Sequence, residues 1–177
     1  PARAWPCPDD LNPILEIIGS AEKPMLIAGH GVWWSKSEKQ LESLAISHNI
    51  PVFNVPYHQK LLSEACEAYM GLADIHQYEP SRDALEQADV VIMVGARLDN
   101  QMNFGNAPFF PDTLKLICVN GSHEEMEMNR SADYGLLSDP GAFFDALAHL
   151  DPFDSGWIES NRQLRSEWVD KTISEIP

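Results

Sequence analysis

Three short runs that are apolar throughout constrain what this chain can fold into: Met25–Ala28, Val90–Val94 and Leu116–Val119. A strand with one wet face alternates apolar and polar residues, whereas a central strand of a parallel sheet is covered on both faces and is apolar throughout. We therefore interpret the runs as central parallel strands. Pro51–Val55 is a fourth strand, and Tyr134–Leu137 is a weaker fifth.

Amphipathic segments between these runs predict helices. The segment from about Asp10 to Gly19 carries its apolar residues on one side. Ser35 and Glu38 have the spacing of a capping box, which predicts a helix that begins there and ends at Asn49. A further helix is expected from about Ser81 to Gln87. Because a strand, a helix and a strand follow one another within about thirty residues, the pattern is that of a βαβ unit.

Two more helices are expected near the C-terminus. Asp139 can cap a helix whose first position suits Pro140, and a long terminal helix begins after Asp154. The segments Tyr57–Pro80 and Asn100–Pro111 show no periodicity and are expected to be irregular surface loops. The alternation of strands and helices predicts an α/β fold with a doubly wound, mainly parallel sheet.

Length and charge exclude several classes of protein. A chain of 177 residues favours one domain, which we place at residues 1–150, with residues 151–177 as a helical extension or a linker to another domain. A formal net charge of −15 argues against a nucleic-acid partner. No apolar stretch approaches the roughly 20 residues of a membrane helix, and the first residues lack the basic region followed by an apolar segment that is typical of a signal peptide. Three widely spaced cysteines indicate a reducing compartment, so we expect a cytoplasmic protein. The first residue is Pro1 and not Met, which suggests a piece of a longer chain.

Three loops follow predicted strands and are expected to meet at the carboxyl edge of the sheet, where ligands bind in folds of this kind. These loops are Gly29–Val32, Gly95–Asp99 and Asn120–His123. The glycine pair Gly29 and Gly31 lets a ligand approach the backbone, or merely turns a strand into a helix.

A guanidinium in the second loop is a candidate ligand for a phosphate or a carboxylate. Arg97 can bind such a group in a bidentate manner, or it forms a structural ion pair with Asp99 or a helix end. The six histidines show no metal-ligand spacing, and no nucleophile elbow surrounds Ser35. We therefore predict neither a catalytic residue nor a metal site in this chain.

Four segments in register carry a family resemblance: Lys23–Val32, Leu41–Val52, Ala88–Leu98 and Leu116–Asn120. Over about residues 10 to 150, the chain resembles the middle domain of thiamine-diphosphate-dependent enzymes. The Gly-Ala-Arg-Leu turn, with Phe104-Gly105 after it, is most similar to oxalyl-CoA decarboxylase and 2-hydroxyacyl-CoA lyase, with acetolactate synthase close by.

The resemblance implies a six-stranded, Rossmann-like sheet of the FAD/NAD-binding-domain type. It also implies a homo-oligomeric parent with a pyrimidine-binding domain before this one and a diphosphate-binding domain after it. In the family, thiamine diphosphate and magnesium bind through a Gly-Asp-Gly motif of the last domain. This chain contains no such motif, so it is expected to be inactive alone and to serve as a scaffold.

The resemblance further implies a platform for ADP or FAD, since some family members bind these nucleotides in the middle domain. The expected nucleotide-binding residues are Gly29, His30, Gly31, Gly95, Arg97, Asn120 and Asp139. Asn120 stands where the family usually has an aspartate. An asparagine accepts a ribose hydroxyl without the charge-assisted part of the bond, about 1 kcal/mol.

Two other functions are compatible with such a sheet. A free-standing nucleotide-binding or interaction module would share the fold without a catalytic parent, because fold alone does not determine function. An NAD-dependent deacylase-like enzyme is disfavoured, since no histidine lies in a recognisable catalytic arrangement.

Overall fold

Six parallel strands form one sheet in the computed structural model of the chain, which describes residues 3–56, 60–126 and 128–175. The spatial order is β3-β2-β1-β4-β5-β6, and every neighbouring pair is parallel. The strands are β1 (Pro24–Ala28), β2 (Val52–Asn54), β3 (Tyr69–Leu72), β4 (Val90–Val94), β5 (Lys115–Asn120) and β6 (Tyr134–Leu137). The chain builds outward from β1 to one edge and then from β4 to the other, so the predicted doubly wound α/β fold is confirmed.

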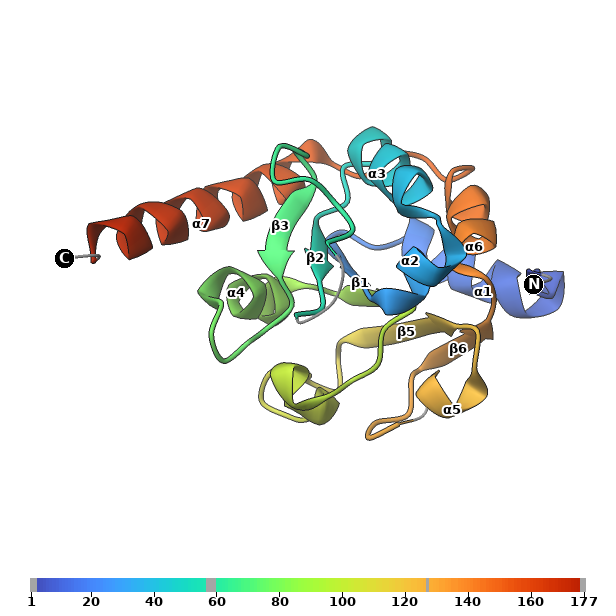
Figure 1. Ribbon diagram of the computed structural model, residues 1–177. Coiled ribbons are helices and arrows are strands. Elements are labelled where there is room, and N and C mark those ends of the chain that lie inside the picture. The colour runs from blue at the N-terminus through green and yellow to red at the C-terminus, as the bar shows by residue number, and fades with distance from the viewer. Residues whose placement is uncertain (1–2, 57–59, 127, 176–177) are drawn as a thin grey trace.

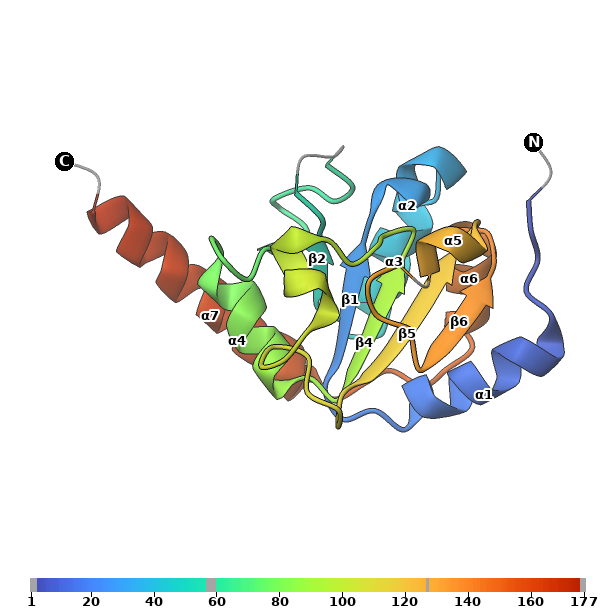
Figure 2. The ribbon, with the colours of Figure 1, turned by 90° about the horizontal axis from the view of Figure 1, so that it is seen from below.

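Helices cover both faces of this sheet (Figures 1 and 2). The helices α2, α3 and α6 form one layer, whereas α4 and a short 3-10 segment, η1, lie on the opposite side. The helices are α1 (Pro8–Gly19), α2 (His30–Ser35), α3 (Glu38–Ser47), α4 (Glu79–Gln87), η1 (Asn100–Gly105), α5 (His123–Met126), α6 (Pro140–Leu147) and α7 (Ser155–Ser174).

The uniformly apolar runs are buried because both faces are covered. Every residue of β1 and β4 is buried. The predicted face of α3 is also buried, including Leu41, Leu44 and His48. His48 is 7% exposed, and its two ring nitrogens lie 3.2 and 3.0 Å from the carbonyl oxygens of Leu44 and Leu150, so it is a core histidine with polar neighbours in two segments.

The predicted capping box at Ser35 is wrong. Ser35 ends α2, Lys36 adopts a left-handed backbone with φ 56°, and α3 begins only at Glu38. The Ser35 hydroxyl donates to the Asp139 carboxylate at 2.8 Å, and the hydroxyl of Ser37 donates to a carbonyl of α2. A contact with the cap of α6 therefore uses the Ser35 hydroxyl that the local spacing assigned to a cap of α3.

The prediction that residues 57–80 form an irregular loop is also wrong in its second half. The edge strand β3 lies there, and α4 begins at Glu79. The strand is short and contains Gly71 at φ 110°, a residue that weakens the strand pattern in a sequence. Residues 57–59 lie outside the described ranges. The other segment expected to be irregular, residues 100–111, contains the short 3-10 segment η1 but no α-helix or strand.

The terminal helix α7 packs on the core at its start and projects away from the sheet toward its end (Figure 1). Trp157 is 5% exposed, and its indole N–H donates to the carbonyl of Pro24 at 2.8 Å, while Ile158 is in the core. Ile173, near the other end, is 62% exposed. A boundary between residues 150 and 151 stays a prediction, and the first turns of α7 belong to the same core as β1.

Candidate functional site

Two backbone turns cross at the carboxyl edge of the sheet, one after β1 and one after β4. Gly29 donates its N–H to the carbonyl of Val94, and Gly31 donates to that of Gly95, both at 2.9 Å. A Cβ at Gly31 would lie 2.6 Å from the Cα of Gly95, which itself has φ 58°. Only glycine tolerates both the contact and the left-handed backbone. The amides of Gly29 and Gly31 therefore hold the two turns together.

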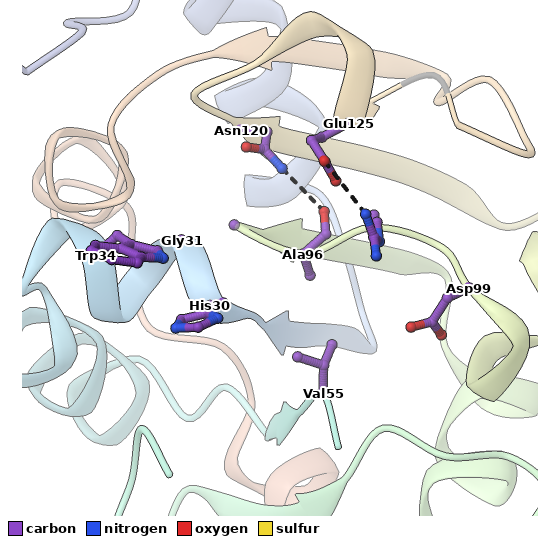
Figure 3. A pocket seen from close by; sticks show the side chains of 10 residues that line it. His30, Gly31, Trp34, Val55, Ala96, Asp99, Asn120 and Glu125 are labelled. Atoms are coloured by element: carbon purple, nitrogen blue, oxygen red, sulfur yellow. Dashed lines mark hydrogen bonds and ion pairs between the residues drawn. The ribbon is translucent and has the colours of Figure 1, made fainter. Parts of the chain in front are cut away.

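A cavity of about 330 Å³ opens beside the crossed turns (Figure 3). It is lined by residues from the ends of several strands, because parallel strands bring their following loops to one edge. Five predicted site residues line it: His30, Gly31, Gly95, Arg97 and Asn120.

A second cavity, of about 290 Å³, adjoins the first and shares Gly31, Trp34, Gly95 and Asn120 with it. Asp139 lines this second cavity. The structure therefore brings six of the seven predicted nucleotide-binding residues to two adjoining cavities. Gly29, the seventh, belongs to the turn after β1 and lines neither cavity.

Arg97 faces Glu125 across the first cavity. One guanidinium nitrogen lies 3.6 Å from the Glu125 carboxylate, and the two side chains are 53% and 37% exposed. Asp99, the partner considered from the sequence, instead accepts a hydrogen bond from the backbone N–H of Gln101 and caps η1. Glu125 was missed by sequence reasoning, because only the packing of α5 against β5 and β6 brings it near Arg97 in the loop after β4.

Both the nitrogen and the oxygen of the Asn120 side-chain amide form hydrogen bonds with nearby backbone groups. Its Nδ2 donates to the carbonyl of Ala96 at 3.3 Å, and its Oδ1 accepts from the N–H of Gly121 at 2.7 Å. Since an amide oxygen has two lone pairs, Oδ1 can accept one more hydrogen bond from a ligand. The side chain also joins the end of β5 to the turn after β4, which orients the floor of both cavities.

Asp139 is the N-cap of α6, as predicted. Its Oδ1 accepts from the N–H groups of Gly141 and Ala142 at 3.0 and 3.3 Å, and its Oδ2 accepts from Ser35. Arg3 lies 3.9 Å from the same carboxylate, which is 12% exposed. Asp139 is thus a structural cap that also borders the second cavity.

Two aromatic side chains of α2 line the cavities: His30 lines the first, and Trp34 lines both. The His30 ring stacks on Trp34, with ring centroids 5.7 Å apart and planes inclined by 25° (Figure 3). Trp34 is 71% exposed, and Trp33 meets it edge-on at 4.8 Å. In the sequence, the two adjacent tryptophans Trp33 and Trp34 follow the glycine turn, but the spacing of apolar residues did not predict that either would line a cavity. Exposed indole faces can stack on a planar ligand.

The first cavity has one cationic side chain and two anionic ones, Arg97 against Asp99 and Glu125. Within the described ranges, no group of three or more His, Cys, Asp or Glu is placed to hold a metal ion. The resemblance assigns magnesium to the diphosphate-binding domain and not to this one, so no chemical step through a metal is assigned to these residues. None of the helices in the part of the chain described here is long and apolar enough to cross a bilayer.

A doubly wound parallel sheet with crossed glycine turns and polar side chains at its carboxyl edge defines a Rossmann-like domain. The family model described as the central domain of thiamine pyrophosphate enzymes matches residues 11–147 of the chain. The chain therefore belongs to the family of thiamine pyrophosphate enzyme central domains.

Two curated relatives cover most of the chain. A 2-hydroxyacyl-CoA lyase of Arabidopsis thaliana is 28% identical over 161 residues, which are 85% of this chain and 26% of the relative. The large subunit of an acetolactate synthase of Mycobacterium tuberculosis is 30% identical over 161 residues, 90% of this chain and 28% of the relative. This chain thus spans little more than a quarter of the length of either protein.

A solved structure has the same fold. A benzoylformate decarboxylase from Polynucleobacter necessarius superposes with a TM-score of 0.72 over 86% of this chain and 29% of that one, at 18% identity. The predicted family and the six-stranded fold are confirmed by these comparisons.

Proposed function

We propose that this chain works as the central domain of a larger thiamine-diphosphate-dependent enzyme that makes or breaks carbon–carbon bonds next to a carbonyl. The observation that carries the proposal is the family match over residues 11–147, together with relatives of which the matched segment is little more than a quarter. In this proposal, a pyrimidine-binding and a diphosphate-binding domain hold thiamine diphosphate and magnesium. The domain described here separates and positions them and has no activity alone.

The proposal extends to the surroundings of the parent enzyme. It is a cytoplasmic homo-oligomer, in keeping with three cysteines that are all free and with the chain's net charge of −15. Neither a nucleic acid nor a membrane is its partner.

The site at the carboxyl edge acts as a platform for ADP or FAD. Arg97 can bind a phosphate, Asn120 can accept one further hydrogen bond from a ribose hydroxyl, and Trp34 offers an indole face to a planar ring. Each of these three side chains lines the first cavity, and its volume of about 330 Å³ lies at the lower end of the usual range for ligand sites.

Titration calorimetry with ADP and with FAD tests the platform directly. Heat from either ligand that saturates below millimolar concentration supports it, and silence from both at millimolar ligand defeats it. Arg97→Ala should weaken ADP binding roughly tenfold, because the phosphates would then face the carboxylates of Asp99 and Glu125 without a compensating cation. Asp99→Ala should not weaken binding, and equal losses for the two variants would count against the assigned site.

A free-standing module of the same fold is the second candidate, because fold alone does not determine function. The reading frame on either side of this segment separates the two candidates. A Gly-Asp-Gly motif with a later asparagine downstream supports the enzyme, and its absence from the complete frame supports the module.

A further inference from the structure

Glu125 occupies the position at which an incoming phosphate would meet Arg97. Its carboxylate lies 3.6 Å from the guanidinium, and both side chains line the first cavity (Figure 3). Arg97 is the cavity's one cationic side chain among the described residues that line it. A ligand phosphate therefore competes with a carboxylate that is part of the protein.

The position of Glu125 is held by packing. It lies on α5, and the next residue, Met126, is 4% exposed and packs in the core. Glu125 is thus anchored at the rim of the cavity, whereas its neighbour Glu124 is exposed and does not line it.

The charges of the cavity favour a ligand with little negative charge. With Asp99 on the same wall, one guanidinium faces two carboxylates, a formal sum of −1. The ion pair itself is weak, since both partners are more than one-third exposed. A phosphate can displace Glu125 from Arg97, but the carboxylate then remains a few ångströms from the new anion and repels it.

We propose that Glu125 is a specificity-determining residue, which makes this cavity bind the adenosine part of a nucleotide with little added affinity from its phosphates. The inference rests on the nucleotide platform proposed above and concerns the same site. Adenosine and ADP should therefore bind the unmodified chain with dissociation constants within about threefold of each other, whereas a site with a free arginine would prefer ADP by tenfold or more.

Titration calorimetry with adenosine and ADP on Glu125→Gln tests the proposal. Glutamine keeps the length and the hydrogen-bonding capacity of the side chain and removes its charge. We expect ADP to bind roughly fivefold more tightly at low salt, because removing a repulsive charge at a part-exposed site is worth about 1 kcal/mol. Adenosine should bind unchanged. The gain for ADP should fall below about twofold at 0.5 M salt, where the screening length is about 4 Å.

Glu124→Gln is the matched control, since it removes the same charge from the adjacent residue without altering the cavity. It should leave ADP affinity within about twofold of the unmodified chain. Circular dichroism and a thermal unfolding curve establish that both variants fold. If Glu125→Gln proves unfolded, Glu125→Ala replaces it in the same titrations.

The possible results separate this inference from the platform proposal. ADP binding that Glu125→Gln leaves unchanged, or that Glu124→Gln strengthens equally, overturns the role of Glu125 and leaves the platform standing. An equal gain for adenosine also overturns it, because a neutral ligand should not respond to the charge. ADP binding by Glu125→Gln with none by the unmodified chain overturns the inference, because it contradicts the near-equal binding of adenosine and ADP expected of the unmodified chain. Silence from every variant toward both ligands defeats the two proposals together.

Discussion

Replacing Gly95 by alanine tests whether the crossed turns position the candidate site. The new Cβ would lie 2.6 Å from the Cα of Gly31, a distance at which the backbone must move. The residue also has φ 58°, which costs about 1 to 2 kcal/mol for a residue with a side chain. Forcing an extra carbon into a packed region costs about 1 to 3 kcal/mol more. We expect Gly95→Ala to lower the free energy of unfolding by roughly 2 to 5 kcal/mol.

Gly121→Ala is the matched control, because Gly121 lies in the loop after the neighbouring strand and nothing lies within 4 Å of a Cβ added there. Its backbone is not left-handed. The change should therefore leave stability within about 0.5 kcal/mol, or raise it slightly by restricting the unfolded chain.

Urea unfolding followed by circular dichroism measures both variants. In a thermal scan, a loss of about 3 kcal/mol corresponds to roughly 6 to 12 °C for a chain of this size. If Gly95→Ala unfolds within 0.5 kcal/mol of Gly121→Ala, the two turns do not pack backbone against backbone, and the geometry of the site given above is incorrect.

Three further outcomes are expected from the buried and capping residues. Asp139→Ala should lower the free energy of unfolding by about 1.5 to 3 kcal/mol in urea titrations, because it removes the cap of α6 and leaves the partly buried Ser35 hydroxyl without its acceptor. The control Asp154→Ala removes one exposed cap bond and should cost less than about 1 kcal/mol. A thiol reagent should modify Cys7 rapidly in the folded chain and Cys118 only after unfolding, because Cys7 is exposed and burial raises the pKa of Cys118 to about 12. Fast reaction of two or more thiols in the folded chain would contradict this. Because the thiol of Cys118 loses its proton more readily in the unfolded chain, its contribution to stability is complete below about pH 9 and is lost as the pH rises toward 12. The free energy of unfolding should fall by at most about 1.4 kcal/mol per pH unit in this range, and Cys118→Ala should make the fall less steep.

Much of the fold could be predicted because its signals are local. A central parallel strand must be apolar at every position, so β1 and β4 are evident from apolar runs of four and five residues. The cap of α6 is equally local, since the aspartate accepts hydrogen bonds from backbone N–H groups of the first turn and the proline suits the first helical position. The edge strand β3 lacks such a signal, because it is four residues long, contains a glycine and leaves Leu72 41% exposed.

The candidate site required the order of the strands. Residue types near the strand ends indicated Arg97 and Asn120, because parallel strands direct their loops to one edge. The partner of Arg97 is 28 positions away on α5, and the acceptor of the Ser35 hydroxyl is 104 positions away on the cap of α6. Such pairs depend on which strands become neighbours, and no spacing in the chain encodes them.

The amino-acid order alone was thus enough to establish a buried parallel sheet, the family to which it belongs and the edge at which its loops gather. Burial requires apolar residues wherever a strand is covered, and that requirement leaves its trace at each position. The charge balance around Arg97 and the backbone contact between Gly31 and Gly95 arose only on folding. Both depend on distances between segments that are remote in the chain, and packing sets those distances.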